Sequence, residues 1–138
     1  MTIRLAAGPF EVTVAPQGPT AQAQAADIAR MTLDKRFHGD LEATSTGEML
    51  AFRSAATQGS GGYVALETVR GSLQGRTGSF VLQHSSTMTR GVPEQSVTVV
   101  PDSATGELVG LAGRMVIDIA AHGAHSYRFD YTLPSADA

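Results

Sequence analysis

The stretch "GSFVLQHSS", Gly78 to Ser86, indicates the fold class. Successive residues of a β-strand point to opposite faces, so this apolar stretch ends with Gln83 on one face and His84 on the other. Polar residues at the end of an apolar strand are typical of a place where a sheet meets water. We therefore interpret Gly78 to His84 as a strand whose last two residues, Gln83 and His84, lie where the sheet ends.

Short apolar stretches of this kind recur along the chain. The 15 Gly and 6 Pro separate them, and the connections are short runs of Gly and Ser that suit hairpin turns. Connections this short leave no room for crossover helices, so neighbouring strands should be antiparallel. The sequence predicts an all-β fold, a small closed antiparallel barrel of about eight strands, rather than a sandwich. The expected strands cover residues 10–14, 42–53 with a break near Gly47, 63–69, 78–84, 95–100, 108–120 with a bend at Gly110 or Gly113, and 125–133.

The segment "TAQAQAADIARM", Thr20 to Met31, is the one place where a helix is an alternative. Thr20 is a good N-cap residue and the alanines favour a helix. From Ile28 onward, however, apolar and polar residues alternate as in a half-buried strand. We expect a loop or a short helical turn, followed by the eighth strand.

The last strand, "HSYRFDYTL" from His125 to Leu133, has the clearest alternation. One face carries aromatic residues and the other carries polar ones, which is typical of a strand buried on one side. We expect Tyr127 and Tyr131 to fill the interior of the barrel rather than to hold a ligand.

Length and composition limit the function classes. The 138 residues suit one domain, residues 1–138, and we expect flexible ends at about 1–8 and 134–138. Ten basic and 13 acidic residues, with no run of like charge, do not suggest a nucleic-acid partner. The absence of Cys excludes disulfides and thiolate metal sites. No segment approaches the roughly 20 apolar residues of a membrane span, and no signal peptide is recognisable, so we expect a soluble cytoplasmic protein.

The glycines of "RGSLQGRTGSF" and "TGELVGLAGR" most simply shape hairpins and strand bends. A phosphate-binding loop is the alternative. Such a loop precedes a helix or contains a Gly-Lys-Ser/Thr triplet, and neither segment does. We therefore expect no phosphate site and no cofactor.

Four segments in order along the chain resemble the bacterial family called domain of unknown function 3224 (DUF3224). They are "KRFHGDL" from Lys35, "GYVALETVRGSLQGRTGSFVLQHSSTM" from Gly62, "VVPDSATGELVGLAG" from Val99 and "HSYRFDYTL" from His125. The glycine pattern before Phe80 is also similar to that of plant allene oxide cyclases. This second resemblance implies a calycin-like, allene oxide cyclase-like barrel, but it does not carry over the cyclase reaction.

Two charged residues fall on expected strand faces. Lys35, the only lysine, lies in phase with Leu33 and Phe37, where it is either an amine of lowered pKa or a side chain whose stem packs at the barrel rim. Glu67 lies in phase with Tyr63, so both would line the lumen if that face points inward. A buried carboxylate needs a partner, and the candidates are Lys35, Arg53 and Arg76.

His84 is a candidate for catalysis or ligand binding, although a histidine at the end of a strand is more often a rim residue. His122 and His125 form an H-x-x-H pair in an expected hairpin turn, which is weak evidence for zinc, and we expect no metal. The serines around His84 lack the motif of a catalytic nucleophile.

Two functions of different class fit this sequence. The first is a barrel that binds a small, mostly apolar molecule and isomerises or cyclises it. The catalytic candidates are then Glu67, Lys35 and His84, and the ligand-binding candidates are Lys35, Arg53, Tyr63, Glu67, Arg76, Gln83 and His84. The second is a filled, ligand-free structural or protein-interaction barrel that forms a homo-oligomer. Eight-stranded barrels have a size compatible with either.

Overall fold

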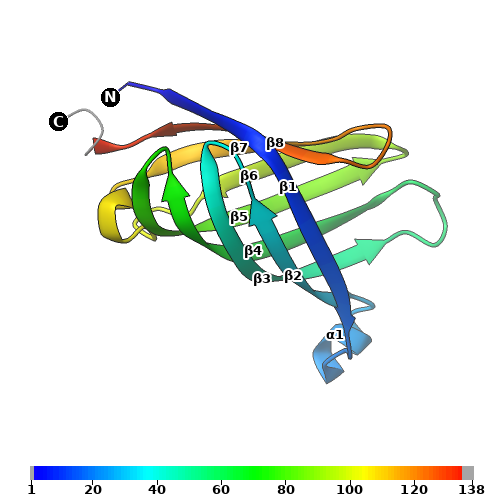
Figure 1. The fold of residues 1–138 in the computed structure, drawn as a ribbon. Helices are drawn as coiled ribbons and strands as arrows, with labels where there is room; N and C mark the ends of the chain where they lie inside the picture. Colours follow the sequence, from blue (N-terminus) through cyan, green and yellow to red (C-terminus); the bar gives the residue numbers. More distant parts are fainter. Residues whose placement is uncertain (1, 135–138) are drawn as a thin grey trace.

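Eight strands form one closed antiparallel barrel in the computed structural model, which describes residues 2–134. Each strand pairs with the next along the chain, and β8 pairs with β1. The strands are β1 (Arg4–Gln17), β2 (Ala29–Phe37), β3 (Leu41–Arg53), β4 (Gly61–Leu73), β5 (Arg76–Thr89), β6 (Val92–Val99), β7 (Ala112–Ile119) and β8 (His125–Thr132). The expected all-β class, antiparallel pairing and strand number are confirmed (Figure 1).

The turns follow from the sequence. Gln74-Gly75 between β4 and β5, and Arg90-Gly91 between β5 and β6, both adopt positive φ at their two positions. Two-residue hairpins use this conformation because its twist matches that of the flanking strands. The short helix α1 (Ala21–Ala25) begins after Thr20, whose Oγ accepts a hydrogen bond from the Ala23 N–H at 3.1 Å. The expected order of a helical turn and then a strand is therefore confirmed. Among residues 2–134 no helix is long and apolar enough to cross a membrane.

Two expectations about strand extents are wrong. No strand begins at residue 108, because residues 106–108 form a 3-10 helix, η1 (Gly106–Leu108). Leu108 is buried there, and Leu111, just before β7, is buried too. β3 runs without a break through Gly47. The N-terminal segment from Arg4 onward, expected to be flexible, pairs with β8. Residues 135–138 of the expected flexible end lie outside the described part of the chain.

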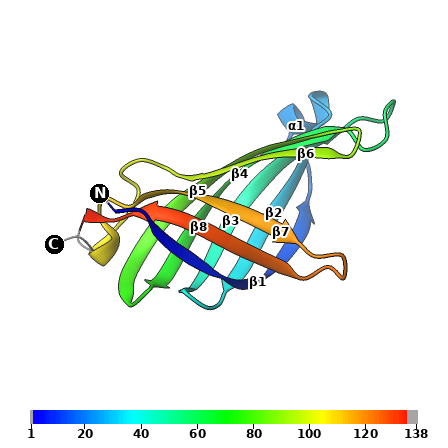
Figure 2. The same ribbon diagram turned by 90° about the horizontal axis from the view of Figure 1, so that it is seen from above.

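The two ends of the barrel differ. The end beside the termini, here called the closed end, is covered by the segment that contains η1 (Figure 1). Gly78 on β5 permits this cover, because a Cβ there would lie 2.1 Å from the Thr105 carbonyl oxygen. The connections after β3, β5 and β7 lie at the other end, here called the open end (Figure 2).

The interior is packed more tightly at the closed end than at the open end. Fully buried side chains fill the closed end: Phe37, Leu41, Leu73, Phe80, Leu108 and Phe129. Inward-facing side chains at the open end are only partly buried: Val12, Met31, Met49, Tyr63, Ser86, Ile117 and His125. β6 and β7 also pair over only two residue pairs, Val97 with Met115 and Thr98 with Arg114. Toward the open end, a side chain replaces the backbone pairing between β6 and β7. The Gln95 side chain accepts a hydrogen bond from the Ile117 N–H at 2.8 Å.

Candidate functional site

Glu67 of β4 is the centre of a buried polar cluster midway along the barrel. Its side chain is 0% exposed, and its carboxylate meets three hydrogen-bond partners from three other strands. Lys35 Nζ of β2 lies 2.7 Å from Oε2, His84 Nε2 of β5 lies 2.6 Å from the same oxygen, and Ser45 Oγ of β3 lies 2.8 Å from Oε1. Four consecutive strands therefore each contribute one side chain, here called the Glu67 cluster.

The register of β3 and β4 makes room for this arrangement. Gly47 of β3 pairs with Glu67, and a Cβ at Gly47 would lie 2.2 Å from the Leu66 carbonyl oxygen and 2.8 Å from the Glu67 Cβ. Because β3 lies between β4 and β2, the Glu67 side chain must pass over β3 to reach Lys35. A larger residue at position 47 would occupy that path.

The cluster holds Glu67 in its ionised form. Burial by itself would raise the pKa of Glu67, but the hydrogen bond from His84 and the positive charge of Lys35 outweigh burial and lower the pKa from 4.5 to about 2. Lys35 also lies over the rings of Phe10 and Phe37, with Nζ 5.3 and 5.8 Å from their centroids. These contacts hold the ammonium against aromatic faces that attract a cation.

An ionised carboxylate can only accept hydrogen bonds, which determines the orientation of His84. Nε2 of His84 must carry the proton that it donates to Glu67. Among residues 2–134 the His84 ring makes no second hydrogen bond, so in the neutral ring Nδ1 retains a free lone pair. The ring itself is 3% exposed.

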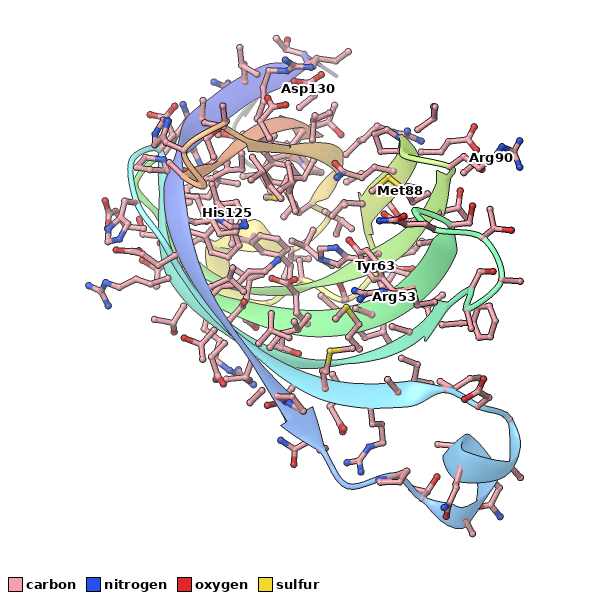
Figure 3. The ribbon with its side chains drawn as sticks, turned by 90° about the vertical axis from the view of Figure 1, so that its right-hand side faces the viewer. Arg53, Tyr63, Met88, Arg90, His125 and Asp130 are labelled. Carbon is pink, nitrogen blue, oxygen red and sulfur yellow. The ribbon has the colours of Figure 1, made fainter. Side chains whose placement is uncertain are left out.

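Tyr63 and Ser86 lie next to His84 on the side of the open end. The Tyr63 ring centroid is 6.3 Å from that of His84, and Tyr63 pairs with Ser86 across β4 and β5. The Ser86 Oγ is buried, and no partner for it lies within the described part of the chain. Figure 3 looks into this end and shows Tyr63 near Arg53 and Met88.

Four of the candidate residues predicted from sequence come together: Lys35, Tyr63, Glu67 and His84. Of the three partners considered for Glu67, Lys35 is the one found. Two expectations about position are wrong. His84 does not end a strand, because β5 continues to Thr89, and the Lys35 ammonium, with a side chain 5% exposed, does not reach solvent at a rim.

The other three candidates lie outside the Glu67 cluster. Arg53 is exposed at the end of β3 and Arg76 begins β5 at the closed end. Gln83 is exposed on the outer face of β5, because the alternation that brings His84 inward turns Gln83 outward. Sequence reasoning missed Ser45, and it treated Ser86 as an ordinary strand residue. The run of small inward-facing residues around Gly47 is the signal that could have marked the space beside Glu67.

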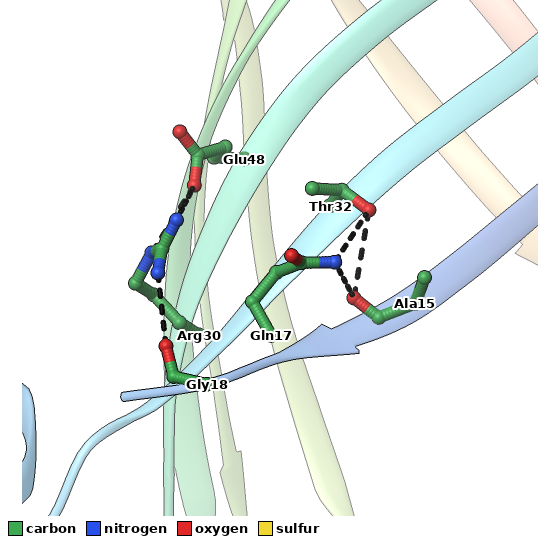
Figure 4. A network of polar contacts seen from close by, with 6 residues as sticks. All are labelled: Ala15, Gln17, Gly18, Arg30, Thr32 and Glu48. Carbon is green, nitrogen blue, oxygen red and sulfur yellow. Dashed lines mark hydrogen bonds and ion pairs between the residues drawn. The ribbon is translucent and has the colours of Figure 1, made fainter. Parts of the chain in front are cut away.

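A hollow of about 940 Å³ lies on the outer face of β3, β4 and β5. Leu50, Val64 and Leu66 line it, together with Arg30, Glu48 and Gln83. Arg30 donates to Glu48 at 3.0 Å and to the Gly18 carbonyl at 3.0 Å, as Figure 4 shows. His84 is also among the residues that line this hollow, whereas Lys35 and Glu67 line neither it nor a second hollow of about 320 Å³. Because its charged groups are exposed and paired with each other, we place the candidate site inside the barrel, at the Glu67 cluster.

The described histidines do not form a metal site. Among residues 2–134 no group of three or more His, Cys, Asp or Glu side chains is arranged to hold a metal ion. His122 is exposed in the turn between β7 and β8, whereas the His125 ring packs 5.2 Å from the Phe10 ring.

Comparison with known proteins agrees with the barrel. Residues 6–131 match the family described as protein of unknown function (DUF3224). A crystal structure of a protein with unknown function from the DUF3224 family of Shewanella oneidensis MR-1 is 45% identical in sequence, with a TM-score of 0.88. That alignment covers 96% of this chain and 98% of the other. Among curated proteins none matches this chain.

Proposed function

The chain belongs to the DUF3224 family of proteins of unknown function, and we propose that the open end of its barrel binds a small, mostly apolar molecule. The bound molecule would lie against the half-buried inner wall and meet the Glu67 cluster at its inner end. The residues that would touch it are Met31, Met49, Tyr63, His84 and Ser86.

The observation that carries this proposal is the position of the Glu67 cluster, between an end filled by fully buried side chains and an end whose inward-facing side chains are only partly buried. Burying charges is costly, and apolar residues of similar size often stabilise a core as well or better. The closed end demonstrates that this sequence can fill a barrel with apolar side chains. A buried charged cluster beside half-buried inward-facing side chains is instead typical of a site with a function.

The inner wall of the open end has the composition of a small-molecule site. Apolar side chains such as Met31 and Met49 supply most of the contact, and few polar atoms are available to orient a ligand. The buried Ser86 Oγ has no partner in the described chain, so a ligand would satisfy it. Lys35 and Glu67 are covered by protein and would act through His84 rather than by contact.

Titration with the fluorescent apolar probe N-phenyl-1-naphthylamine tests this proposal. We expect saturable binding that weakens about tenfold or more when Met49→Trp fills the open end. Leu66→Ser is the matched control, because Leu66 is 55% exposed in the outer hollow and lies beside Glu67 in sequence. We expect it to leave binding unchanged.

Two results would overturn the proposal. Absence of saturable binding would favour the alternative of a ligand-free structural or interaction barrel. Binding that survives Met49→Trp but is lost in Leu66→Ser would assign the probe to the outer hollow. Native mass spectrometry of the purified protein would then identify any molecule that the barrel retains.

A further inference from the structure

Resting on the ligand site proposed above, we infer that His84 is a general base in that site. Glu67, held by Lys35, is its positioning residue, and the substrate is a mostly apolar carbonyl compound with an acidic C–H group. The geometry that supports this inference is a fixed imidazole with unpaired hydrogen-bond donors beside it.

Glu67 selects the tautomer of His84 whose Nδ1 can act as a base. The 2.6 Å contact between Nε2 and a carboxylate that cannot donate puts the proton of neutral His84 on Nε2. Nδ1 has no hydrogen-bond partner in residues 2–134, and it is not among the side-chain atoms that are fully buried without a partner. Nδ1 is therefore the nitrogen available to take a proton from a bound molecule.

Lys35 and Ser45 hold the carboxylate in place. Lys35 Nζ shares Oε2 with His84, and Ser45 Oγ occupies Oε1, so Glu67 is bonded on both oxygens. Since all three side chains are buried, the imidazole plane is held by groups that do not reorient with solvent. This is the arrangement expected of a base that must stay aligned between turnovers.

Ser86 and Tyr63 supply donors for the oxygen of a carbonyl group. The Ser86 Oγ is without a partner, and the Tyr63 hydroxyl makes no hydrogen bond to other residues of the described chain. Ser86 is two residues from His84 on the same face of β5, and the Tyr63 ring lies beside the His84 ring. Donors aimed at developing negative charge are a large source of catalysis in enolisation.

The step balances without a co-reactant. Nδ1 takes the proton from the carbon next to the carbonyl, and the electron pair of the broken C–H bond forms the enolate double bond. The carbonyl oxygen becomes the enolate oxygen and accepts hydrogen bonds from Ser86 and Tyr63. In a carbonyl compound with a β,γ C=C bond this enolate is a dienolate. The imidazolium then returns the proton to the γ carbon, and the C=C bond moves to the α,β position, so the overall reaction is an isomerisation.

The tautomer of His84 can be tested without any ligand. In a two-bond ¹H–¹⁵N spectrum of the ¹⁵N-labelled protein, the neutral ring should show a protonated Nε2 and an unprotonated Nδ1. His84→Gln assigns the resonance, and its amide can still donate to Glu67. A neutral His84 with the proton on Nδ1 would overturn the inference.

The base itself is tested with 5-nitrobenzisoxazole, a small apolar carbon acid. A base removes its C–H proton, the N–O bond breaks, and the coloured 2-cyano-4-nitrophenolate forms. With binding of this probe verified by displacement of N-phenyl-1-naphthylamine, we expect ring opening to fall about a hundredfold in His84→Gln, the lower range for a general base. Glu67→Gln should shift the pH midpoint of the rate, which a purely structural role would not move.

The two proposals fail in different ways. If the probes bind but ring opening is no faster than in buffer, or is unchanged in His84→Gln, the general base is disproved and the ligand site stands. If neither probe binds, the ligand site is disproved. Leu66→Ser, which changes only the outer hollow, should match the unmodified protein in every assay.

Discussion

The closed and open ends of the barrel are built from the same strands but packed in opposite ways. At the closed end, aromatic rings stack on one another: Phe80 and Phe129 have centroids 5.9 Å apart, and Phe129 and Tyr131 have centroids 5.3 Å apart. At the open end, inward-facing side chains such as Met31 and Met49 keep part of their surface exposed. The Glu67 cluster separates these two regions.

The difference between the two ends suggests a division of roles. The closed end buries the large apolar side chains that stabilise the fold, whereas the open end leaves apolar surface uncovered. The sequence left two hypotheses, a filled barrel without a ligand and a barrel that binds a small molecule, and each fits one end of the molecule. The filled barrel corresponds to the closed end, and the ligand-binding barrel is our proposal for the open end.

Truncating a buried aromatic side chain at the closed end should cause the largest loss of stability. Phe80 is 1% exposed, and Phe80→Ala should lower the free energy of unfolding by about 3–5 kcal/mol through lost burial and a cavity. Met49→Ala at the open end should cost only about 1 kcal/mol, because its side chain is already partly in water. Urea denaturation of the two variants measures both. Equal losses would mean that the two ends are packed alike.

Removing the charge of Glu67 should cause the second-largest loss of stability. Glu67→Gln leaves Lys35 buried without a counter-ion and should cost about 3 kcal/mol in denaturant unfolding. Adding Lys35→Met should recover much of that loss, because no uncompensated charge then remains. Glu48→Gln is the control, since its ion pair with Arg30 is exposed and should be worth less than about 1 kcal/mol. A double variant no more stable than the single one would contradict this account.

The pH dependence of stability should reveal the same charge. The pKa of Glu67 is lowered in the folded protein, so its ionisation stabilises the fold above 4.5, and this stabilisation is lost as pH falls from 4.5 toward about 2. A lowering of two to three pKa units corresponds to roughly 3 kcal/mol. We therefore expect the stability difference between the unmodified protein and Glu67→Gln to shrink over this pH range. Parallel curves would show that Glu67 titrates normally.

Filling the space beside Glu67 should cause the smallest loss of stability of these changes. Gly47→Ala places a methyl group against the Leu66 carbonyl and the Glu67 side chain and should cost about 1–3 kcal/mol. Gly18→Ala meets no atom within 4 Å and should change thermal stability little. If Gly47→Ala behaves like Gly18→Ala, Glu67 does not need the space over β3.

The sequence alone was sufficient for the barrel and for the buried face of its last strand, but for most other strands it left open which face points inward. Alternation along His125–Leu133 correctly predicted that Tyr127 and Tyr131 are buried, because side-chain direction in a strand is a local property. Strand ends were less predictable. The 3-10 helix at Gly106–Leu108 covers the closed end through contacts with β5, which are distant in sequence.

The sequence also determined that Lys35, Tyr63, Glu67 and His84 are polar residues on apolar strand faces. Only the tertiary structure decided which of them meet. Pairing of β2 through β5 brings Lys35 and His84 to the same oxygen of Glu67, and it leaves Arg53, Arg76 and Gln83 outside the cluster. The physical reason is that period-two alternation specifies the face of each residue but not its height along the barrel. That height depends on the register between strands, which long-range packing sets.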